Sequence, residues 1–446
     1  MEIEKLKQKI LDLAIRGKLV PQDPSDEPAS VLIDRIHAEK EELIKQGKIK
    51  RSKEDSYIYK GRDNCYYEKV GDKTTCINDE IPFDIPNNWT WIRLCNVGIW
   101  KAGSTPLRSN PKYYGGKIAW LKTGELNEGT IVETEETVTD LALEECSLHL
   151  NPIGAVLIAM YGATIGKLGI AGIELCTNQA CCACVTNDLI VNQYLFFYLK
   201  AIKSQLISKS AGGAQPNISR EILINTLIAL PPKKEQYEII KQLEVLLDKT
   251  NKISQQYDEI GKLLYILRAK ILEDIFGENS RYKSYYMHYG TLSDFGTLIS
   301  GRDLKPDEYN DDNNGVPYLT GASNFENDTV IINRWTPCPV VLSLENDVLI
   351  TCKGTIGKTA INKIKKCHIA RQIMAFRCNE KVLPGFLKLY FEYMTTTLQK
   401  ASSSLIPGIT RSIMLSLNVA SPPIEKQQEI IENTQKIMLI LESIIY

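Results

Sequence analysis

Two glycine turns that end in lysine are the residues of this chain best suited to hold a charged ligand. They are Gly162-Ala163-Thr164-Ile165-Gly166-Lys167 and Gly354-Thr355-Ile356-Gly357-Lys358. Glycine lets a ligand approach the backbone amides closely and lysine adds positive charge, so such turns suit phosphate groups. Neither is a nucleotide-binding loop, because both lack the spacing of Gly-x-x-x-x-Gly-Lys-Ser/Thr, and Lys167 is followed by Leu168 rather than by a magnesium-binding hydroxyl. The alternative is that the glycines only turn the chain between strands.

A second pair of polar turns lies near the end of each half of the chain. Gln215-Pro216-Asn217-Ile218-Ser219-Arg220 matches Ile406-Pro407-Gly408-Ile409-Thr410-Arg411. Amide, hydroxyl and guanidinium groups can bond base edges or phosphates in a DNA groove. The same turns could instead cap the start of a helix.

Catalytic and metal sites are not predicted. Cys181 and Cys184 have Cys-x-x-Cys spacing, but Cys176 and Cys182 lie in the same apolar stretch and a zinc site needs two more ligands. A buried strand is therefore favoured, and the 12 cysteines are expected to be reduced. The sequence also lacks an Asn-Pro-Pro-aromatic motif of amino methylation. We predict no catalytic residue, no metal site and no cofactor in this chain.

The segments that carry these turns occur twice in the same order, which predicts a long-period repeat. Each glycine turn follows an apolar strand, at Ala155–Met160 and at Val348–Thr351. Earlier landmarks also match: residues 101–106 and 300–306 form loops after a strand, and 120–124 resemble 318–321. The stretches between landmarks differ freely. This pattern suggests one scaffold used for two different ligands of the same kind.

Long helices link the two halves. Pro231-Pro232-Lys233-Lys234-Glu235-Gln236 and Pro422-Pro423-Ile424-Glu425-Lys426-Gln427 each open an apolar stripe whose spacing alternates four and three, as in a coiled coil. The second stripe stops at Tyr446, and residues 6–12 resemble residues 267–273, so the N-terminus completes the second helix. We expect an antiparallel pair with a seam of Ile239, Leu243, Leu246, Ile253, Tyr257, Ile260, Leu264, Leu267, Ile271, Ile430, Ile437, Leu441, Ile444, Leu6 and Ile10.

Composition sets limits on the class of protein. A chain of 446 residues with 43% hydrophobic content can bury two cores, and it has no apolar run of membrane-spanning length. Residues 1–17 carry alternating charges rather than a signal peptide, so we expect a cytoplasmic protein. The net charge of -1 argues against nucleic-acid binding unless one face is locally basic. Candidates for such a face include Arg93, Lys101 and Arg108 in the first half and Lys305 in the second.

Residues 21–82 have no counterpart in the second half. They contain a predicted helix from Ser30 to Gln46 and the basic run Lys48-Ile49-Lys50-Arg51-Ser52-Lys53. We interpret this stretch as an accessory arm. The basic run could contact phosphate, but short charge runs are more often solvated.

Together these features resemble the DNA-specificity subunit of type I restriction-modification systems. The resemblance covers nearly the whole chain and rests on the paired glycine turns ending in Thr-Ile-Gly-Lys, the paired Pro-Pro-x-x-x-Gln helix starts and the opening residues 5–22. It implies an α/β (α+β) fold with two target-recognition domains in a pseudo-twofold arrangement, separated by two long antiparallel coiled-coil helices. The expected segments are 1–20 (terminal helix), 21–82 (accessory arm), 83–231 (first recognition domain), 232–277 (central helix), 278–422 (second recognition domain) and 423–446 (terminal helix).

The resemblance also implies a role and partners. A subunit of this family has no catalytic residues, and it directs adenine methylation and DNA cleavage by two methylation subunits and two motor-nuclease subunits. S-adenosylmethionine, ATP and magnesium are then expected in those partners. The expected DNA contacts are Lys101, Ser104, Lys122, Thr123, Thr164, Lys167, Gln215, Asn217, Ser219, Arg220, Arg302, Thr320, Asn324, Lys353, Thr355, Lys358, Arg371, Thr410 and Arg411.

The loops at 101–114 and 302–314 differ most between the halves, so they are the favoured base readers, and a target with two unlike halves follows. The central helix, about 50 Å long at ~1.5 Å per residue, would set the gap between them. Two alternatives stay open. One is a non-catalytic scaffold whose paired domains bind protein or glycan, which a net charge near zero supports. The other is a stand-alone DNA methyltransferase, which requires motifs that this chain lacks.

Overall fold

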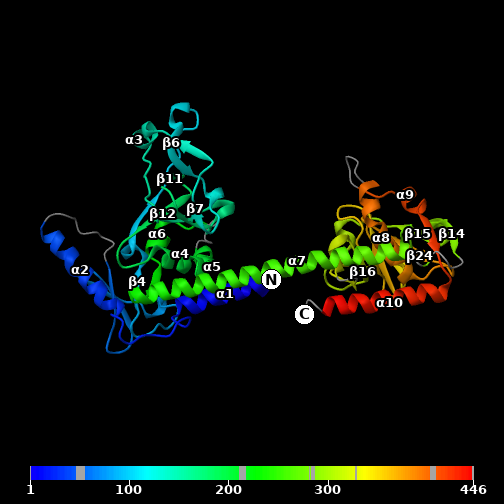
Figure 1. Ribbon diagram of the computed structural model, residues 1–446, viewed down its shortest axis with the longest axis horizontal. Coiled ribbons are helices and arrows are strands. Elements are labelled where there is room, and N and C mark those ends of the chain that lie inside the picture. The colour runs from blue at the N-terminus through cyan, green and yellow to red at the C-terminus, as the bar shows by residue number, and fades with distance from the viewer. Residues whose placement is uncertain are drawn as a thin grey trace. The chain divides into compact units, whose positions relative to one another are not determined.

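The computed structural model describes residues 2–46, 56–209, 217–280, 282, 287–326, 329–401 and 408–443. It forms two compact units, Met1–Ser254 and Gln255–Tyr446, and each contains sheets beside helices (Figure 1). The boundary between the units falls inside α7 (Lys233–Phe276), a single helix of 44 residues. Within the described ranges, no helix is both long and apolar enough to cross a membrane.

The first unit is organised around a five-stranded sheet of order β5-β12-β9-β10-β7. Every residue of β9 is buried, which explains its uninterrupted apolar sequence. A three-stranded sheet of order β11-β6-β8 and the pair β13-β4 complete the body. The strands are β4 (Thr90–Arg93), β5 (Gly98–Ala102), β6 (Tyr114–Leu121), β7 (Thr130–Ile131), β8 (Glu136–Val138), β9 (Val156–Ala159), β10 (Leu168–Ala171), β11 (Leu175–Thr177), β12 (Cys181–Thr186) and β13 (Leu227–Leu230).

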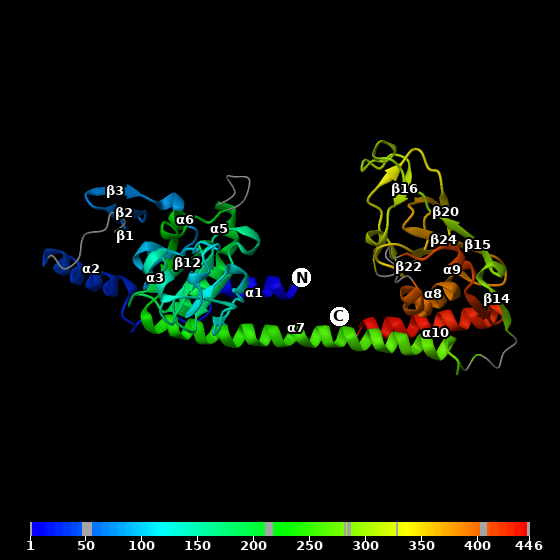
Figure 2. The ribbon, with the colours of Figure 1, turned by 90° about the horizontal axis from the view of Figure 1, so that it is seen from above.

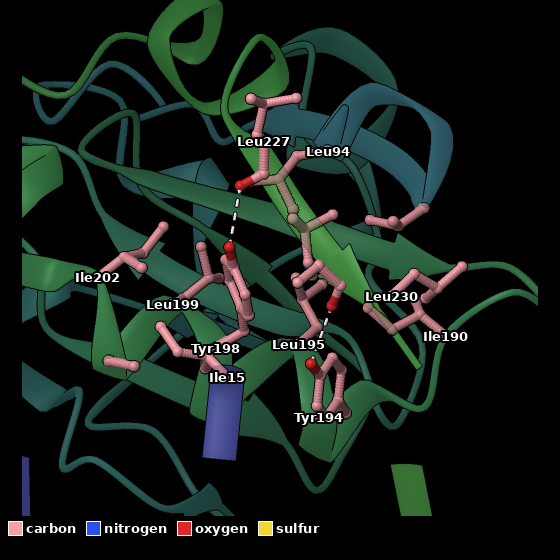
Figure 3. Packing of buried hydrophobic residues seen from close by; sticks show 14 of the residues in the cluster. Ile15, Leu94, Ile190, Tyr194, Leu195, Tyr198, Leu199, Ile202, Leu227 and Leu230 are labelled. Carbon is pink, nitrogen blue, oxygen red and sulfur yellow. Dashed lines mark hydrogen bonds between the residues drawn. The ribbon is translucent and has the colours of Figure 1, made fainter. Parts of the chain in front are cut away.

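Helix α4 (Asn192–Ala201) packs between the sheet and the first helix of the chain, α1 (Glu2–Ile15). Tyr194 and Tyr198 are fully buried on α4 and donate their hydroxyl hydrogens to the carbonyls of Ala229 at 2.9 Å and Leu227 at 3.2 Å (Figure 3). A buried tyrosine needs such a partner, so these bonds fix α4 to β13. Shorter helices are α3 (Asp140–Glu145), α5 (Lys203–Lys209) and α6 (Arg220–Ile224).

The accessory stretch is more structured than the sequence predicts. It contains α2 (Ala29–Lys45), close to the expected helix, and a three-stranded sheet of β1 (Tyr57–Lys60), β2 (Tyr66–Val70) and β3 (Lys73–Cys76). Arg93 of β4 anchors this sheet, because its guanidinium bonds Glu68 at 2.7 Å, Glu80 at 2.8 Å and the carbonyl of Asn225 at 2.7 Å. Arg93 is therefore a structural residue and not part of a basic binding face. The run Lys48–Lys53 lies outside the described residues.

The second unit repeats the first without the accessory stretch. Its main sheet has the order β15-β24-β21-β22, beside β19-β16-β23-β20 and the pair β14-β25. Its helices are α8 (Pro384–Ala401), α9 (Arg411–Leu415) and α10 (Ile424–Ser443). The strands are β14 (His288–Thr291), β15 (Gly296–Ser300), β16 (Val316–Leu319), β17 (Phe325–Glu326), β18 (Thr329–Val330), β19 (Trp335–Thr336), β20 (Leu342–Leu344), β21 (Val348–Thr351), β22 (Thr359–Ile361), β23 (Lys366–Ile369), β24 (Ile373–Cys378) and β25 (Asn418–Ser421).

The glutamine of each Pro-Pro-x-x-x-Gln motif joins the sheet-containing body of its unit to the helix that follows. Gln236 is fully buried; its side-chain oxygen accepts from the Val191 amide at 2.8 Å, and its nitrogen donates to the carbonyls of Leu189 and Pro231. Gln427 is equally buried and bonds the Leu383 amide at 2.7 Å and the carbonyls of Lys381 and Pro422. The repeated motif therefore has a structural meaning in both units.

Each unit holds its own antiparallel helix contact. In the first unit, Gln22, just after α1, bonds Glu235 at the start of α7, whereas Lys7 and Leu11 of α1 line one groove with Leu247 and Asn251 of α7. In the second unit, α10 runs beside the end of α7, and Ile430 lines a cavity with Ile275 and Phe276 (Figure 2). The chain is thus two helix–domain–helix repeats that share α7.

The predicted seam is buried only in part. Ile239, Leu243, Ile10 and Ile430 are buried, and Leu246, Ile260, Leu264, Ile271 and Leu441 are half-buried. The expectation of a continuous buried seam is wrong for Leu6, Ile253, Tyr257, Leu267 and Ile437, which are exposed. The buried positions belong to the hydrophobic core of one or the other unit, so burial follows those cores rather than the whole stripe. Ile444 lies outside the described residues.

Candidate nucleic-acid interface

The polar turns of the first unit meet at one end of its main sheet. Strands β5, β9 and β6 end there, and the turn between β11 and β12 lies among them. The Ser104 amide donates to the Thr177 carbonyl at 3.0 Å, the Asn178 amide to Leu121 at 2.9 Å and the Met160 amide to Ala180 at 2.7 Å. A bridge between Tyr161 and Asn217 adds the last turn. We call residues 101–106, 122–125, 161–167, 178–180 and 217–220 the first edge.

The second unit builds the same end from the matching backbone bonds. The Arg302 amide donates to the Ile369 carbonyl at 2.9 Å, the Ala370 amide to Leu319 at 2.9 Å and the Cys352 amide to Gln372 at 2.8 Å. A bridge between Lys353 and Gly408 replaces the one between Tyr161 and Asn217. We call residues 300–305, 320–324, 352–358, 370–372 and 408–411 the second edge. The two edges have equivalent backbone hydrogen bonds and different side chains.

One glycine in each edge is required by close packing of two backbones. A Cβ atom on Gly103 would lie 2.1 Å from the Thr177 carbonyl oxygen, and one on Gly301 would lie 2.1 Å from that of Ala370. No other residue fits there, because a backbone atom cannot give way as a flexible side chain can. By contrast, Gly162 and Gly354 have φ of +80° and +70° with open space around them, so they serve the turn itself.

The basic side chains of the edges are of two kinds. Lys101 and Lys353 are exposed, and neither forms an ion pair among the described residues; Lys167 is half-buried and also unpaired there, and Arg302 is exposed. The positive charge of Lys122 is already compensated, because the carboxylates of Glu135 and Glu136 lie 2.8 and 3.1 Å from its ammonium and raise its pKa. Arg371 is bound to Asp303 at 2.6 Å. Lys358 donates to the carbonyls of Ala322 and Phe325, at 3.2 and 3.3 Å.

The polar turn before α6 and its counterpart before α9 do cap helices. The Ser219 hydroxyl accepts from the Ile222 amide, and the Thr410 hydroxyl accepts from the Ile413 amide. Arg220 donates to the Trp100 carbonyl at 3.0 Å, and Arg411 donates to that of Leu298. The capping alternative is therefore present in both units. Asn217, Arg220, Thr410 and Arg411 remain exposed at the edges, whereas Gln215 lies outside the described residues.

Two predicted contacts are corrected by their burial. Asn324 is fully buried: its oxygen accepts from the amides of Thr320 and Gly321, and its nitrogen donates to the Ile331 carbonyl. Thr123 is 8% exposed. Polar side chains of short turns often form hydrogen bonds to the backbone of their own turn. The residue type and its position in the sequence therefore did not reveal that these two residues are buried. Ser104, Thr164 and Thr320 are half-buried, and Thr355 is exposed.

Several edge residues lie in or near the predicted loops but were not singled out as site residues. Thr105 hydrogen-bonds Gln179 across two loops of the first edge. Trp120 and His368 lie beneath the edges and bond their loops. The landmark 120–124 aligned with 318–321 pointed to the Trp120 position, but His368 carried no signal because the matching residue, Cys176, differs in type.

The cysteine pair at 181 and 184 behaves as an apolar core pair. Both thiols are fully buried on β12, and burial raises the pKa of each, which disfavours the thiolate that binds metal. Among the described residues, no group of three or more His, Cys, Asp or Glu side chains could hold a metal ion.

The fold and its two edges define a tandem-repeat protein that presents two similar sets of loops on rigid sheets. The family described as "Type I restriction modification DNA specificity domain" matches residues 86–261 and 287–442, which is more than half of the chain. The chain belongs to this family.

Curated relatives carry the same kind of description. The chain is 30% identical over 272 residues to the type I restriction enzyme EcoEI specificity subunit of Escherichia coli, a match that covers 57% of this chain and 41% of that protein. It is 22% identical over 390 residues to the MjaVIII specificity subunit of Methanocaldococcus jannaschii, covering 80% and 88%. The match to the first relative thus spans about two fifths of that protein's length.

Solved structures support the fold. A chain from a type I restriction-modification system, described in terms of complex assembly and conformational transition, superposes with a TM-score of 0.67 at 21% identity, covering 81% of this chain and 93% of that one. The HsdS subunit from Thermoanaerobacter tengcongensis gives a TM-score of 0.50 at 22% identity, covering 82% and 92%.

Proposed function

We propose that this chain is the sequence-specific DNA-recognition subunit of a type I restriction-modification complex. The observation that carries the proposal is the edge built twice, with the same backbone bonds and different side chains. A scaffold of this kind holds loops rigidly while their chemistry varies, as base readout requires. The two edges would read two unlike half-sites, so the target is bipartite and asymmetric.

Each edge divides between positioning and reading. The exposed ammonium groups of Lys101 and Lys353, with Lys167 and Arg302, supply the positive charge that phosphates attract. The loops at 101–114 and 302–314 differ between the units and would meet base edges. Arg108 stacks on Tyr114 at 4.6 Å and on Trp120 at 4.9 Å, but it also pairs with Glu136 and is therefore engaged by a carboxylate as well. Lys122 and Arg371 are engaged by carboxylates and are weaker candidates.

The helices have two roles in the proposal. α7 leaves one recognition domain and leads into the other, so its length would set the unread gap between the half-sites. The exposed apolar residues of the helices, such as Leu263, Tyr265 and Leu439, would be covered by methylation subunits. Two similar units favour two copies of that partner, joined by two motor-nuclease subunits in the full complex. This chain would be non-catalytic, with S-adenosylmethionine, ATP and magnesium bound by its partners.

The test is to map methylated adenines across the genome of a host that expresses this chain with its cognate methylation subunit. A host expressing the methylation subunit alone and a host expressing this chain alone are the controls. A new split motif with a constant gap, present only with this chain, is the expected result. No new methylation from an assembled complex would favour the paired-domain scaffold for protein or glycan, whereas methylation by this chain alone would support a methyltransferase.

A further inference from the structure

The first loop of each edge is held from below by a ring N–H, but the two units take that N–H from different residues. Ser104 and Arg302 are equivalent, because each donates its amide to the last residue of the neighbouring strand, Thr177 or Ile369. The Ser104 carbonyl accepts from the indole Nε1 of Trp120 at 3.1 Å. The Arg302 carbonyl lies 2.8 Å from Nε2 of His368.

The two donors occupy the two different positions of one cross-strand residue pair. Trp120 on β6 pairs with Cys176 on β11, and the equivalent rung of the second unit pairs Tyr318 on β16 with His368 on β23. The donor therefore lies on opposite strands of the pair in the two units, β6 in the first and β23 in the second. The carbonyl that it bonds is at the equivalent position in both. Trp120 is 1% exposed and His368 is 0% exposed, so neither ring can reach a ligand itself.

The surroundings of His368 decide which ring nitrogen carries the hydrogen. Nδ1 lies 3.1 Å from the Val341 amide and 3.4 Å from the Val340 amide, and both of these groups are donors. Nδ1 must therefore be the bare acceptor, and Nε2 carries the hydrogen that bonds Arg302. The ring of Tyr318 packs on His368 at 5.0 Å, and its hydroxyl accepts from the Leu304 amide at 3.3 Å. Tyr114 supports the first loop similarly, by donating to the Pro106 carbonyl at 2.6 Å.

We propose that Trp120 and His368 are specificity-determining positioning residues, each fixing through one ring N–H the loop that reads one half-site. The proposal rests on the function proposed above. Without the N–H, the loop gains alternative conformations and its side chains meet more than one base, whereas the exposed lysines still hold the phosphates. Discrimination between bases falls, while affinity for DNA in general is retained.

Three substitutions test the ring N–H, and the two at His368 separate it from ring packing. Trp120→Phe removes the donor together with part of the ring. His368→Asn keeps an acceptor near Nδ1 but loses the donor to Arg302, and His368→Gln places an N–H near Nε2. Each is co-expressed with the cognate methylation subunit, the complex is checked for assembly, and the methylated motif is mapped across the genome. The half-site that a variant leaves untouched is an internal control.

Trp120→Phe should relax base preference in one half-site and His368→Asn in the other, each by about tenfold, as expected for loss of one hydrogen bond. His368→Gln should retain most of the preference that His368→Asn loses. The inference is overturned if Trp120→Phe and His368→Asn both leave the motif unchanged, or if His368→Gln and His368→Asn fail alike, since ring packing would then be the cause. Absence of any split motif with the wild-type chain would instead refute the proposed function.

Discussion

At the scale of single residues, the lysines of the two edges differ in whether other groups of the protein already bind their ammonium groups. Both glycine turns end in lysine, yet Lys358 donates to backbone carbonyls while Lys353, just before the second turn, is exposed and forms no ion pair among the described residues. Whether a lysine is available depends on acceptors such as Ala322 and Phe325, which come from a different part of the chain. A single sequence contains no information on such contacts, so availability could not be predicted.

Lys101 and Lys353 give a test of phosphate binding. Lys101→Gln and Lys353→Gln should weaken DNA binding of the assembled complex similarly for all sequences, and each should reduce the slope of log K against log salt by about 0.9. Lys122→Gln is the matched control, because Glu135 and Glu136 already neutralise that ammonium. Titrations at several salt concentrations measure the slope. An equal effect at Lys122 would show that overall charge, and not contact, is responsible.

His368 should make the second unit sensitive to acid. Burial lowers the pKa of His368 below its usual 6.5, although the carboxylates of Asp303 and Glu308 oppose this. The unfolded chain then binds a proton near pH 6.5 that the folded unit does not, so stability falls as the pH drops through 6.5 toward the folded-state pKa. Thermal unfolding of His368→Gln between pH 7.5 and 5.5 should lose less stability than the wild type. Parallel pH profiles would contradict the prediction.

At the scale of elements, the repeat itself was predictable. The paired proline motifs, glycine turns and apolar strands recur in the same order in sequence and structure, because each is imposed by local geometry: a helix start, a turn with positive φ, or a strand buried on both faces. The accessory sheet was not predictable in this way. Its strands are short and largely exposed, and Arg93, which anchors them, looks like any surface arginine in the sequence.

The buried glutamines test the joint between domain and helix. Gln236→Leu leaves the Val191 amide and the Leu189 carbonyl without a partner and should cost about 2–4 kcal/mol locally, and Gln427→Leu should do the same to the Leu383 amide. Hydrogen exchange should then accelerate at Val191 in one variant and at Leu383 in the other. Gln428→Leu, an exposed neighbour, is the control and should change stability by less than about 0.5 kcal/mol.

At the scale of the whole molecule, α7 connects the two recognition domains. Inserting seven residues, two helical turns, after Gly261 preserves the alternation of four and three and adds ~10 Å at ~1.5 Å per residue. The methylated motif should keep both half-sites and lengthen its gap by about one to three base pairs at ~3.4 Å each. The same seven residues inserted in the β2–β3 turn at Gly71 should leave the gap unchanged. An unaltered gap after the α7 insertion would refute the role of this helix as a spacer.

The exposed apolar side chains of the second unit have a consequence for how long this chain persists in the cell without its partner. Leu263, Tyr265 and Ile266 on α7 and Leu439 and Ile440 on α10 are 59–71% exposed. A chain synthesised before its partner exposes this apolar surface to solvent, which favours aggregation and proteolysis. We expect an orphan chain to be short-lived and an assembled one to persist. The less abundant subunit would then limit the amount of complex. Synthesis of this chain alone would not produce an active complex.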